Sequence, residues 1–295
     1  MIKASGREKA YQICITAIVV LLALVTVFPL YYTVLNSITP QADLAKRVVV
    51  LYPLNITFSA YETVLRDTRL LNSFFISVWR TVIGTALTLA FTSVGAYVVS
   101  RKNLPFRKFF IFMIMVTILF GGGLVPSFVV VMNLGLLNSF WSMIIPGLVD
   151  SWGLLVIKQY FENIPESMEE AAFTDGATEM QYFLRIALPT SGPVLAAIGL
   201  FNAVGHWNSW FDALIYISDG TKIPMQLLLR NMLQGLTNLT NMSLQSGGSS
   251  MFMMYVSPES LKMAMVVIAT VPILCVYPFL QKHFTKGVFL GAVKG

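Results

Sequence analysis

The sequence predicts an all-helical integral membrane protein with six transmembrane helices. Hydrophobic residues make up 56% of the 295-residue chain and charged residues only 12%, whereas a soluble domain is about half apolar and about one quarter charged. The apolar residues gather in six charge-poor stretches, each near or above the ~20 residues that cross a bilayer as a helix. This composition excludes a soluble enzyme, a disordered chain and a disulfide-linked scaffold.

The first predicted span is Tyr11–Leu35, which lies in a stretch without charge. Lys3, Arg7 and Lys9 precede it, as they would in a secretory signal peptide. The apolar stretch is longer than the ~7–15 residues of a signal-peptide core, and it lacks a small-residue cleavage site. We therefore expect an uncleaved membrane helix after a short N-terminal segment, 1–10.

The other apolar stretches supply the remaining five spans. They are expected near 72–100, at Phe109–Met132, at Phe140–Ile157, within Pro193–Phe211 and at Met263–Leu280. Asn133, Gly135 and Asn138 mark the turn between the third and fourth spans. The three glycines at 121–123 are expected to permit a bend or close helix packing, because no phosphate-binding loop pattern surrounds them.

The distribution of Lys and Arg predicts the orientation of the six-helix domain, 11–281. Twelve of these residues lie in segments 1–10, 101–108, 158–193 and 281–295, against seven in the outer loops 36–72 and 212–262. Because positive residues are enriched in cytoplasmic loops, we expect both termini, including the tail 282–295, in the cytoplasm. The positive clusters border the spans, so nucleic-acid binding is not indicated.

The charge-free outer segment 231–258 is expected to be a loop and not a seventh helix. Sixteen of its 28 residues are Asn, Gln, Gly, Ser, Thr or Pro, a composition typical of flexible connections.

The cytoplasmic segment 163–193 is predicted to form two short helices joined by a tight turn. Asn163 and Glu166 have the spacing of a capping box at the start of the first helix, with Pro165 in its first turn. Gly176 can end this helix in the left-handed conformation.

The second short helix is delimited in the same way. Thr178 and Gln181 form a second capping box, and Pro189 is expected to end the helix because proline cannot donate a helical hydrogen bond.

The two short helices are predicted to be amphipathic. The apolar stripes are expected at Ile164, Met168, Ala171 and Ala172 on the first helix, and at Met180, Phe183, Leu184 and Ala187 on the second. The first helix should turn four side chains outward: Glu166, Glu169, Glu170 and Phe173. Such an acidic surface suits docking to a basic groove of another protein, whereas the alternative is a solvated loop packed on the membrane domain.

The spacing of this segment resembles a known motif. Glu170-Ala171-Ala172, Gly176, Ile186 and Leu188-Pro189 match the EAA motif of ABC importer permeases, in which E-A-A, three residues, G, nine residues and I-x-L-P follow one another.

Outside this motif the chain is similar to the carbohydrate-uptake, maltose-permease-like branch of the family. The residues that carry this similarity are Leu71-Asn72-Ser73, Ala96-Tyr97, Ser100-Arg101, Trp207-Asn208 and Trp210-Phe211. The closing residues Tyr277–Leu280, Lys286–Val288 and Lys294-Gly295 resemble the subgroup that imports oligosaccharides of plant or polysaccharide origin.

The resemblance implies a type I ABC importer transmembrane domain in the cytoplasmic membrane of a bacterium. Its partners would be a second homologous permease, two ABC ATPase subunits, an extracellular or periplasmic sugar-binding protein, the carbohydrate and membrane lipid. ATP and Mg would be bound by the ATPases, so this chain would have no cofactor and no catalytic residue. The residues implied in coupling to the ATPases are Glu170, Ala171, Ala172, Phe173, Asp175, Gly176, Ile186, Leu188 and Pro189.

A sugar path needs aromatic faces and hydrogen-bonding side chains at membrane depth. The candidates are Asn202, Trp207, Asn208, Trp210 and Phe211 near the outer end of the fifth span, together with Trp152, Asp150 and Arg80. The alternative for the tryptophans is an interfacial aromatic belt. Charged residues inside spans are costly and usually functional, so we expect Arg80 and Asp150 to pair, or one of them to face the path beside Trp152. His206 and His283 cannot assemble a metal site.

Three other functions are open on the sequence alone. An ABC permease for a non-sugar solute would carry the same coupling motif. An ion-coupled secondary transporter would need intramembrane carboxylates, of which only Asp150 is available. An intramembrane enzyme would need clustered His, Asp or Glu at membrane depth, and the sequence has no such cluster.

Overall fold

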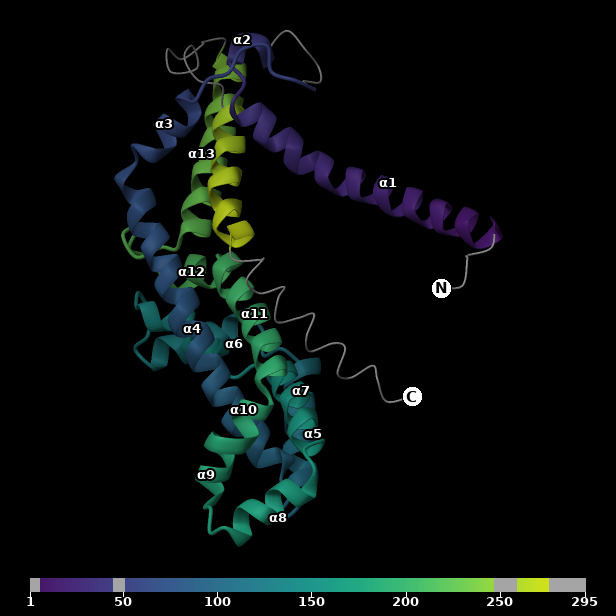
Figure 1. Ribbon diagram of the computed structural model, residues 1–295. Coiled ribbons are helices and arrows are strands. Elements are labelled where there is room, and N and C mark those ends of the chain that lie inside the picture. Colours follow the sequence, from purple (N-terminus) through teal and green to yellow (C-terminus); the bar gives the residue numbers. More distant parts are fainter. Residues whose placement is uncertain (1–5, 45–50, 247–258, 276–295) are drawn as a thin grey trace. The chain divides into compact units, whose positions relative to one another are not determined.

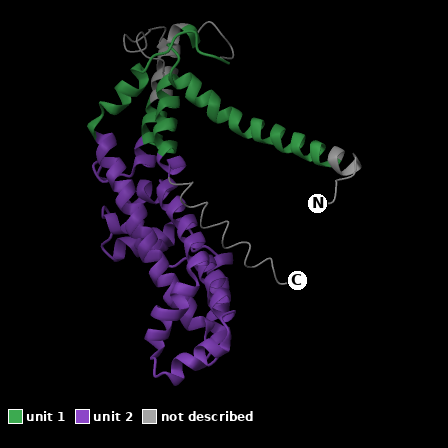
Figure 2. Cartoon of the chain, in the orientation of Figure 1, with its two compact units in different colours: residues 1–68, 229–271 green, residues 69–228, 272–295 purple. Residues whose placement is uncertain are grey.

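The structure is a computed structural model that describes residues 6–44, 51–246 and 259–275 (Figure 1). Regular structure in these ranges is helical throughout. The chain divides into two compact units, residues 1–68 with 229–271 and residues 69–228 with 272–295 (Figure 2). The helical architecture confirms the all-helical part of the predicted fold class.

The first unit contains the first predicted span. Its helices are α1 (Gly6–Ser37), α2 (Gln41–Leu44), α3 (Ser59–Leu65), most of α13 (Met225–Ser246) and most of a helix at 259–275. None of the most apolar part of α1 is buried. Near the end of α1, the Ser37 hydroxyl lies 2.7 Å from the Tyr61 hydroxyl of α3, so this end of the helix is held by the chain itself.

The second unit contains the candidate site. Its helices are α4 (Thr68–Ser100), α5 (Arg107–Leu119), α6 (Leu124–Asn133), the 3₁₀ turns η1 (Phe140–Met143) and η2 (Ile145–Gly147), α7 (Ser151–Glu162), α8 (Glu166–Thr174), α9 (Glu179–Tyr182), the π-helical turn η3 (Phe183–Ala187), α10 (Leu188–Thr190), α11 (Gly192–Asn208) and α12 (Phe211–Tyr216).

Two helices among the described residues, α1 and α4, are long and apolar enough to cross a membrane unbroken. Three bent pairs reach that length together: α5 with α6 at 114°, the residues Phe140–Gly147 with α7 at 49°, and Glu179–Thr190 with α11 at 78°. The described residues therefore contain up to five spans. The sixth predicted span, Met263–Leu280, is helical as far as residue 275, and its remainder lies outside the described residues.

The third and fourth predicted spans, Phe109–Met132 and Phe140–Ile157, are each broken into two helical parts. The third breaks where Gly123 adopts a φ of +83° before α6, because glycine allows a backbone that other residues avoid. The bend expected at 121–123 is thus confirmed. In the fourth span, two 3₁₀ turns precede α7, and Pro146 lies within the second. The predicted turn between the spans is also confirmed, since Gly135 and Asn138 have positive φ.

The expectation of a loop over 231–258 is wrong as far as residue 246. This part continues α13, and residues 247–258 lie outside the described residues. The polar composition of 231–246 did not predict a helix, because the helix starts earlier, in a buried apolar turn that includes Met225 and Leu228. An amphipathic helix tolerates a polar outer face once one side is packed.

A hydrophobic cluster in the second unit joins α4, α7, α8, α9, η3 and α11. It consists of Ala96, Leu154, Ile157, Phe161, Ala172, Tyr182, Phe183, Ala187 and Ile198. Close helix packing helps to build it, since a Cβ at Gly199 of α11 would stand 2.8 Å from the Leu89 side chain of α4. Small residues allow such approaches between membrane helices. The segment 163–193 is attached to α4 through this cluster.

Candidate functional site

The segment 163–193 folds as a helical hairpin, α8 and α9 with the turn between them. Gly176 has a φ of +81°, so the left-handed turn expected there is present. At the start of α9, the Thr178 hydroxyl accepts from the Gln181 N–H, and the Gln181 side chain accepts from the Thr178 N–H. The second predicted capping box is therefore confirmed.

The expected start of the first helix is wrong. Asn163 caps the end of α7, and Pro165 occupies the position before Glu166 without a side-chain cap. Glu166 and Glu169 instead lie in the first turn of α8, where negative charge is favourable at the positive end of the helix dipole.

Pro189 does not end the second helix. It lies within α10, and the chain turns only after Thr190 into α11. The π-helical turn η3 shifts the hydrogen-bond register before it, so the missing proline N–H falls in a first helical turn, where it costs no bond.

The predicted apolar stripes are correct in part. Ala172, Phe183 and Ala187 are buried, whereas Met168, Met180 and Leu184 are exposed. The stripe fails on the second helix because α9 is a single turn followed by η3, which does not keep the 3.6-residue spacing.

Six of the candidate coupling residues are exposed on the hairpin and beside it: Glu170, Ala171, Phe173, Asp175, Gly176 and Pro189. Ile186 and Leu188 are partly buried and pack against the hydrophobic cluster. Phe173 has its ring centroid 5.6 Å from that of Tyr182, so it also packs on the chain itself. The predicted acidic outer surface is smaller than expected, because Glu169 turns toward the chain while Glu166 and Glu170 remain exposed.

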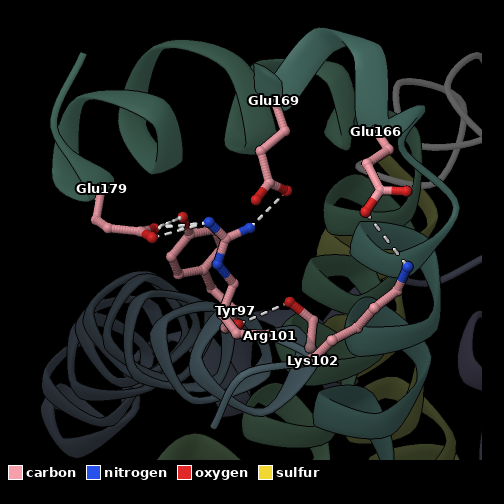
Figure 3. Close-up of polar contacts among 7 residues, drawn as sticks. Tyr97, Arg101, Lys102, Glu166, Glu169 and Glu179 are labelled. Carbon is pink, nitrogen blue, oxygen red and sulfur yellow. Dashed lines mark hydrogen bonds and ion pairs between the residues drawn. The ribbon is translucent and has the colours of Figure 1, made fainter. Parts of the chain in front are cut away.

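Arg101, the first residue after α4, is the residue toward which Glu169 turns. Its Nη1 donates to Glu169 of α8 at 2.7 Å, and its Nη2 donates to both carboxylate oxygens of Glu179 of α9 at 2.9 Å. Tyr97, one turn earlier on α4, donates its hydroxyl to the same Glu179 carboxylate. Figure 3 shows these side chains meeting between the end of α4 and the hairpin. We call Arg101, Glu169 and Glu179 the arginine clasp.

Three aromatic rings surround the guanidinium of Arg101. Its central carbon lies 5.1 Å from the ring centroid of Tyr97, 5.5 Å from that of Tyr182 and 5.8 Å from that of Phe173. These distances are within the range of cation–π attraction. The rings limit the side chain to the directions in which the two carboxylates lie.

The electrostatics of the clasp favour a charged Glu179. Burial alone would raise the pKa of its carboxyl, but the hydrogen bonds from Tyr97 and Arg101 outweigh burial and lower the pKa below its ordinary value. Burial, followed by repulsion from the Glu169 carboxylate, raises the pKa of the Tyr182 hydroxyl. Near neutral pH the lowered pKa keeps the Glu179 carboxylate negative opposite the Arg101 guanidinium.

A second ion cluster fixes the loop between α4 and α5. Arg107 pairs with Glu162 of α7 and donates from Nε to the Val99 carbonyl at 2.8 Å, and Lys158 donates to Glu162 at 2.8 Å. A cavity of about 730 Å³ lies between this loop and the hairpin, with Arg101 and Lys102 among its lining residues. The end of α4 is thus tied to α7 as well as to the hairpin.

Arg80 and Asp150 do not pair with each other. The guanidinium of Arg80 binds the Asp212 carboxylate and donates to the Ser209 and Met143 carbonyls at 3.1 and 3.2 Å. Asp212 escaped the sequence interpretation because it lies just beyond the fifth span. The sequence feature that could have identified Asp212 is its position two residues after Trp210, because tryptophan is enriched where helices meet the membrane surface.

Asp150 instead caps α7, because the fourth span breaks at this residue. Its carboxylate accepts from the Gly153 N–H at 2.9 Å and from the Asn202 side chain of α11 at 3.2 Å, and its own N–H donates to Thr92 of α4 at 3.1 Å. Trp152 and Phe201 lie edge to face next to this group, with centroids 6.1 Å apart. The structure therefore brings three of the path candidates, Asp150, Asn202 and Trp152, together.

The remaining path candidates lie elsewhere in the second unit. Trp207 is buried against Phe74 and lines an apolar cavity of about 410 Å³. Asn208 is the last residue of α11, and Trp210 and Phe211 contact each other edge to face at 5.6 Å. In the part of the chain that the structure describes, no three His, Cys, Asp or Glu side chains are grouped so that they could hold a metal ion.

The chain is similar to known transport proteins over nearly its whole length. Protein LplC of Bacillus subtilis (strain 168) is 40% identical over 272 residues, which are 92% of this chain and 90% of that protein. The polygalacturonan/rhamnogalacturonan transport system permease protein YtcP of the same strain is 37% identical over 290 residues, 98% of this chain and all of that protein. No protein-family model matches the chain.

A solved structure has the same fold. It is a bacterial ABC transporter involved in the import of the acidic polysaccharide alginate, one chain of which is 30% identical and superimposes with a TM-score of 0.84, covering 96% of this chain and all of that one. Fold, identity and coverage agree with the resemblance carried by the EAA spacing. The chain therefore belongs to the family of permease subunits of bacterial ABC importers for sugars, membrane proteins that transport and do not catalyse a reaction of their own.

Proposed function

We propose that this permease imports an oligosaccharide and is coupled to ATP hydrolysis through the hairpin 163–193. The observation that carries this proposal is the hairpin itself, where Glu170 and Ala171 are exposed beside a glycine turn and the EAA spacing is complete. An exposed acidic helix joined to the end of α4 is suited to bind a cytoplasmic protein and to be displaced when that protein changes conformation. Glu170 would meet a basic partner residue, and the small Ala171 would allow close approach.

The proposed topology has six spans with both termini in the cytoplasm. The described residues contain up to five candidate spans. In this proposal the fifth span is α11, the residues Glu179–Thr190 before it lie in the cytoplasm, and the helix at 259–275 would begin the sixth span. The proposed partners are a second homologous permease, two ABC ATPase subunits that bind ATP and Mg, and an extracellular sugar-binding protein. The apolar α5, none of whose thirteen residues is buried, is a surface that lipid or the second permease would cover.

An oligosaccharide is supported by what the relatives carry. One relative is named for polygalacturonan and rhamnogalacturonan transport, and the similar structure for import of the acidic polysaccharide alginate. Within the chain, the group of Asp150, Asn202 and Trp152 offers what a sugar requires, hydrogen-bonding side chains beside an aromatic face. Arg80 is less suited to bind an anionic sugar, because Asp212 already neutralises it.

The proposal is tested by purifying the tagged chain gently from its native membrane with its associated proteins. We expect a second six-span permease and a P-loop ATPase to be recovered with it. After reconstitution with the binding protein, ATP hydrolysis should rise with oligosaccharides of galacturonate or mannuronate and not with amino acids. A chain that purifies only with itself and takes up sugar along an ion gradient would overturn the proposal.

Glu170→Lys tests the coupling role of the hairpin directly. The variant should insert normally but lose the ATPase subunit or its sugar stimulation, because the reversed charge meets a basic groove. Transport at the wild-type rate in this variant would contradict the proposed docking.

A further inference from the structure

The arginine clasp is a polar connection in which a single side chain at the end of a spanning helix holds both arms of the hairpin. Arg101 follows directly on α4, and its two terminal nitrogens reach Glu169 on α8 and Glu179 on α9, on either side of the Gly176 turn (Figure 3). A rotation of the hairpin relative to α4 would have to break at least one of these contacts.

The apolar contacts of α8 do not impose the same restriction. Ala172 is the buried residue of α8, and its side chain is a single methyl group. Apolar burial is non-directional, so a small side chain permits the helix to turn or slide on the hydrophobic cluster. Charge-assisted hydrogen bonds from a planar guanidinium require a fixed direction.

The neighbouring ion pair between Lys102 and Glu166 differs from the arginine clasp in exposure and in the number of contacts. Lys102 lies 3.6 Å from Glu166, and both side chains are about three-quarters exposed, at 78% and 75%. It touches only one arm of the hairpin and lacks the aromatic rings that surround Arg101. It therefore serves as a matched control, with the same charge in the adjacent position but without the bridge.

We propose that Arg101 is a positioning residue that makes the coupling hairpin and α4 move as one rigid body. Movement imposed on α8 and α9 by the ATPases is then passed to the spanning helix through the clasp. This inference rests on the proposed function of the hairpin. The side chains of the clasp are partly exposed, Arg101 at 22%, Glu169 at 35% and Glu179 at 63%. Because exposed ion pairs contribute little stability, the clasp fixes the orientation of the hairpin relative to α4 and adds little to the free energy of folding.

The test compares Arg101→Gln with Lys102→Gln in the complete, reconstituted importer. Both variants should assemble with the ATPase subunits in wild-type amounts and hydrolyse ATP. Arg101→Gln should transport about tenfold less sugar per ATP hydrolysed, whereas Lys102→Gln should stay within about twofold of the wild type. Arg101→Lys restores the charge but not the planar fork, so it should recover only part of the loss.

A distance measurement tests rigidity without transport. Spin labels at Val98 of α4 and Ser167 of α8, in a background with Cys14 and Cys275 replaced by serine, report the separation of helix and hairpin. We expect the same narrow distance distribution with and without ATP in the wild type and in Lys102→Gln. In Arg101→Gln the distribution should broaden or change with ATP.

Two outcomes would overturn the inference. One is an assembled Arg101→Gln importer with a wild-type ratio of sugar to ATP, and the other is a distance distribution that is unchanged in this variant. If Arg101→Gln does not assemble, Glu179→Gln replaces it, because this variant removes the negative charge and one of the two oxygens to which Nη2 donates, and keeps the arginine. A hairpin that binds no ATPase even in the wild type would contradict the proposed function instead, so the two failures are distinguishable.

Discussion

Arg80 of α4 and Asp212 of α12, 132 residues apart in sequence, form an ion pair in which the arginine side chain is 2% exposed and the aspartate 26%. The same guanidinium donates to the carbonyls of Ser209 and Met143. One side chain thus ties α4 to η1 and to the start of α12. A buried charge of this kind is stable only while its partner remains.

Removal of Asp212 alone should therefore destabilise the protein strongly. We expect Asp212→Leu to cost about 3–5 kcal/mol, since it leaves Arg80 buried without its counter-charge. The double variant Arg80→Met, Asp212→Leu should recover most of that loss. Thermal unfolding in detergent with a fluorescence readout measures both, and a double variant no more stable than the single one would contradict this account.

Asp150 allows a separation of structure from transport. Asn is as good a helix N-cap as Asp, so Asp150→Asn should keep the protein assembled and as stable as the wild type. Asp150→Ala should cost about 1 kcal/mol, because the Gly153 N–H loses its cap. If the carboxylate faces the sugar path, Asp150→Asn should raise the sugar concentration needed for half-maximal uptake, and unchanged uptake and assembly would rule that role out.

Gly176 is required for its backbone and not for its size. A Cβ at this position would meet nothing within 4 Å, but its φ is +81°. Gly176→Val should therefore cost about 1–2 kcal/mol in local strain and lower sugar-stimulated ATP hydrolysis. Gly176→Asn, which tolerates the left-handed region, should retain most of the activity. Equal losses in the two variants would show that bulk, and not conformation, is decisive.

The docking of α9 should depend on acidity through Glu179. The pKa of this carboxyl is lowered from its ordinary value of 4.5 in the folded state, so its contribution is complete above 4.5 and is lost as the pH falls through the lowered value. The protection of the α9 amides, measured as the observed exchange rate relative to the intrinsic rate at each pH, should accordingly fall below about pH 4.5. Glu179→Gln should show protection that is already lower at neutral pH and that changes less with acid.

Local features could be predicted where the information is contained in adjacent residues. The Gly176 turn and the capping box of Thr178 and Gln181 depend on contacts within four residues, and both are present. The start of α8 and the helical state of residues 231–246 were predicted wrongly, because they do not depend on adjacent residues alone. Asn163 can end one helix or begin the next, and a polar segment can form a helix or a loop. In both cases the outcome depends on which other parts of the chain pack against the segment.

The sequence by itself determined the membrane-helical class, the approximate positions of most of the spans, the EAA spacing and the family, because composition and short-range spacing carry all four. Only the tertiary structure decided which charges meet. Arg80 pairs with Asp212 and not with Asp150, and Arg101 joins Glu169 and Glu179, which are 68 and 78 residues away. The physical reason is that an ion pair depends on a few ångströms in space, and those distances come from the packing of α4 against α8, α9 and α12, which the spacing of charges along the sequence does not record.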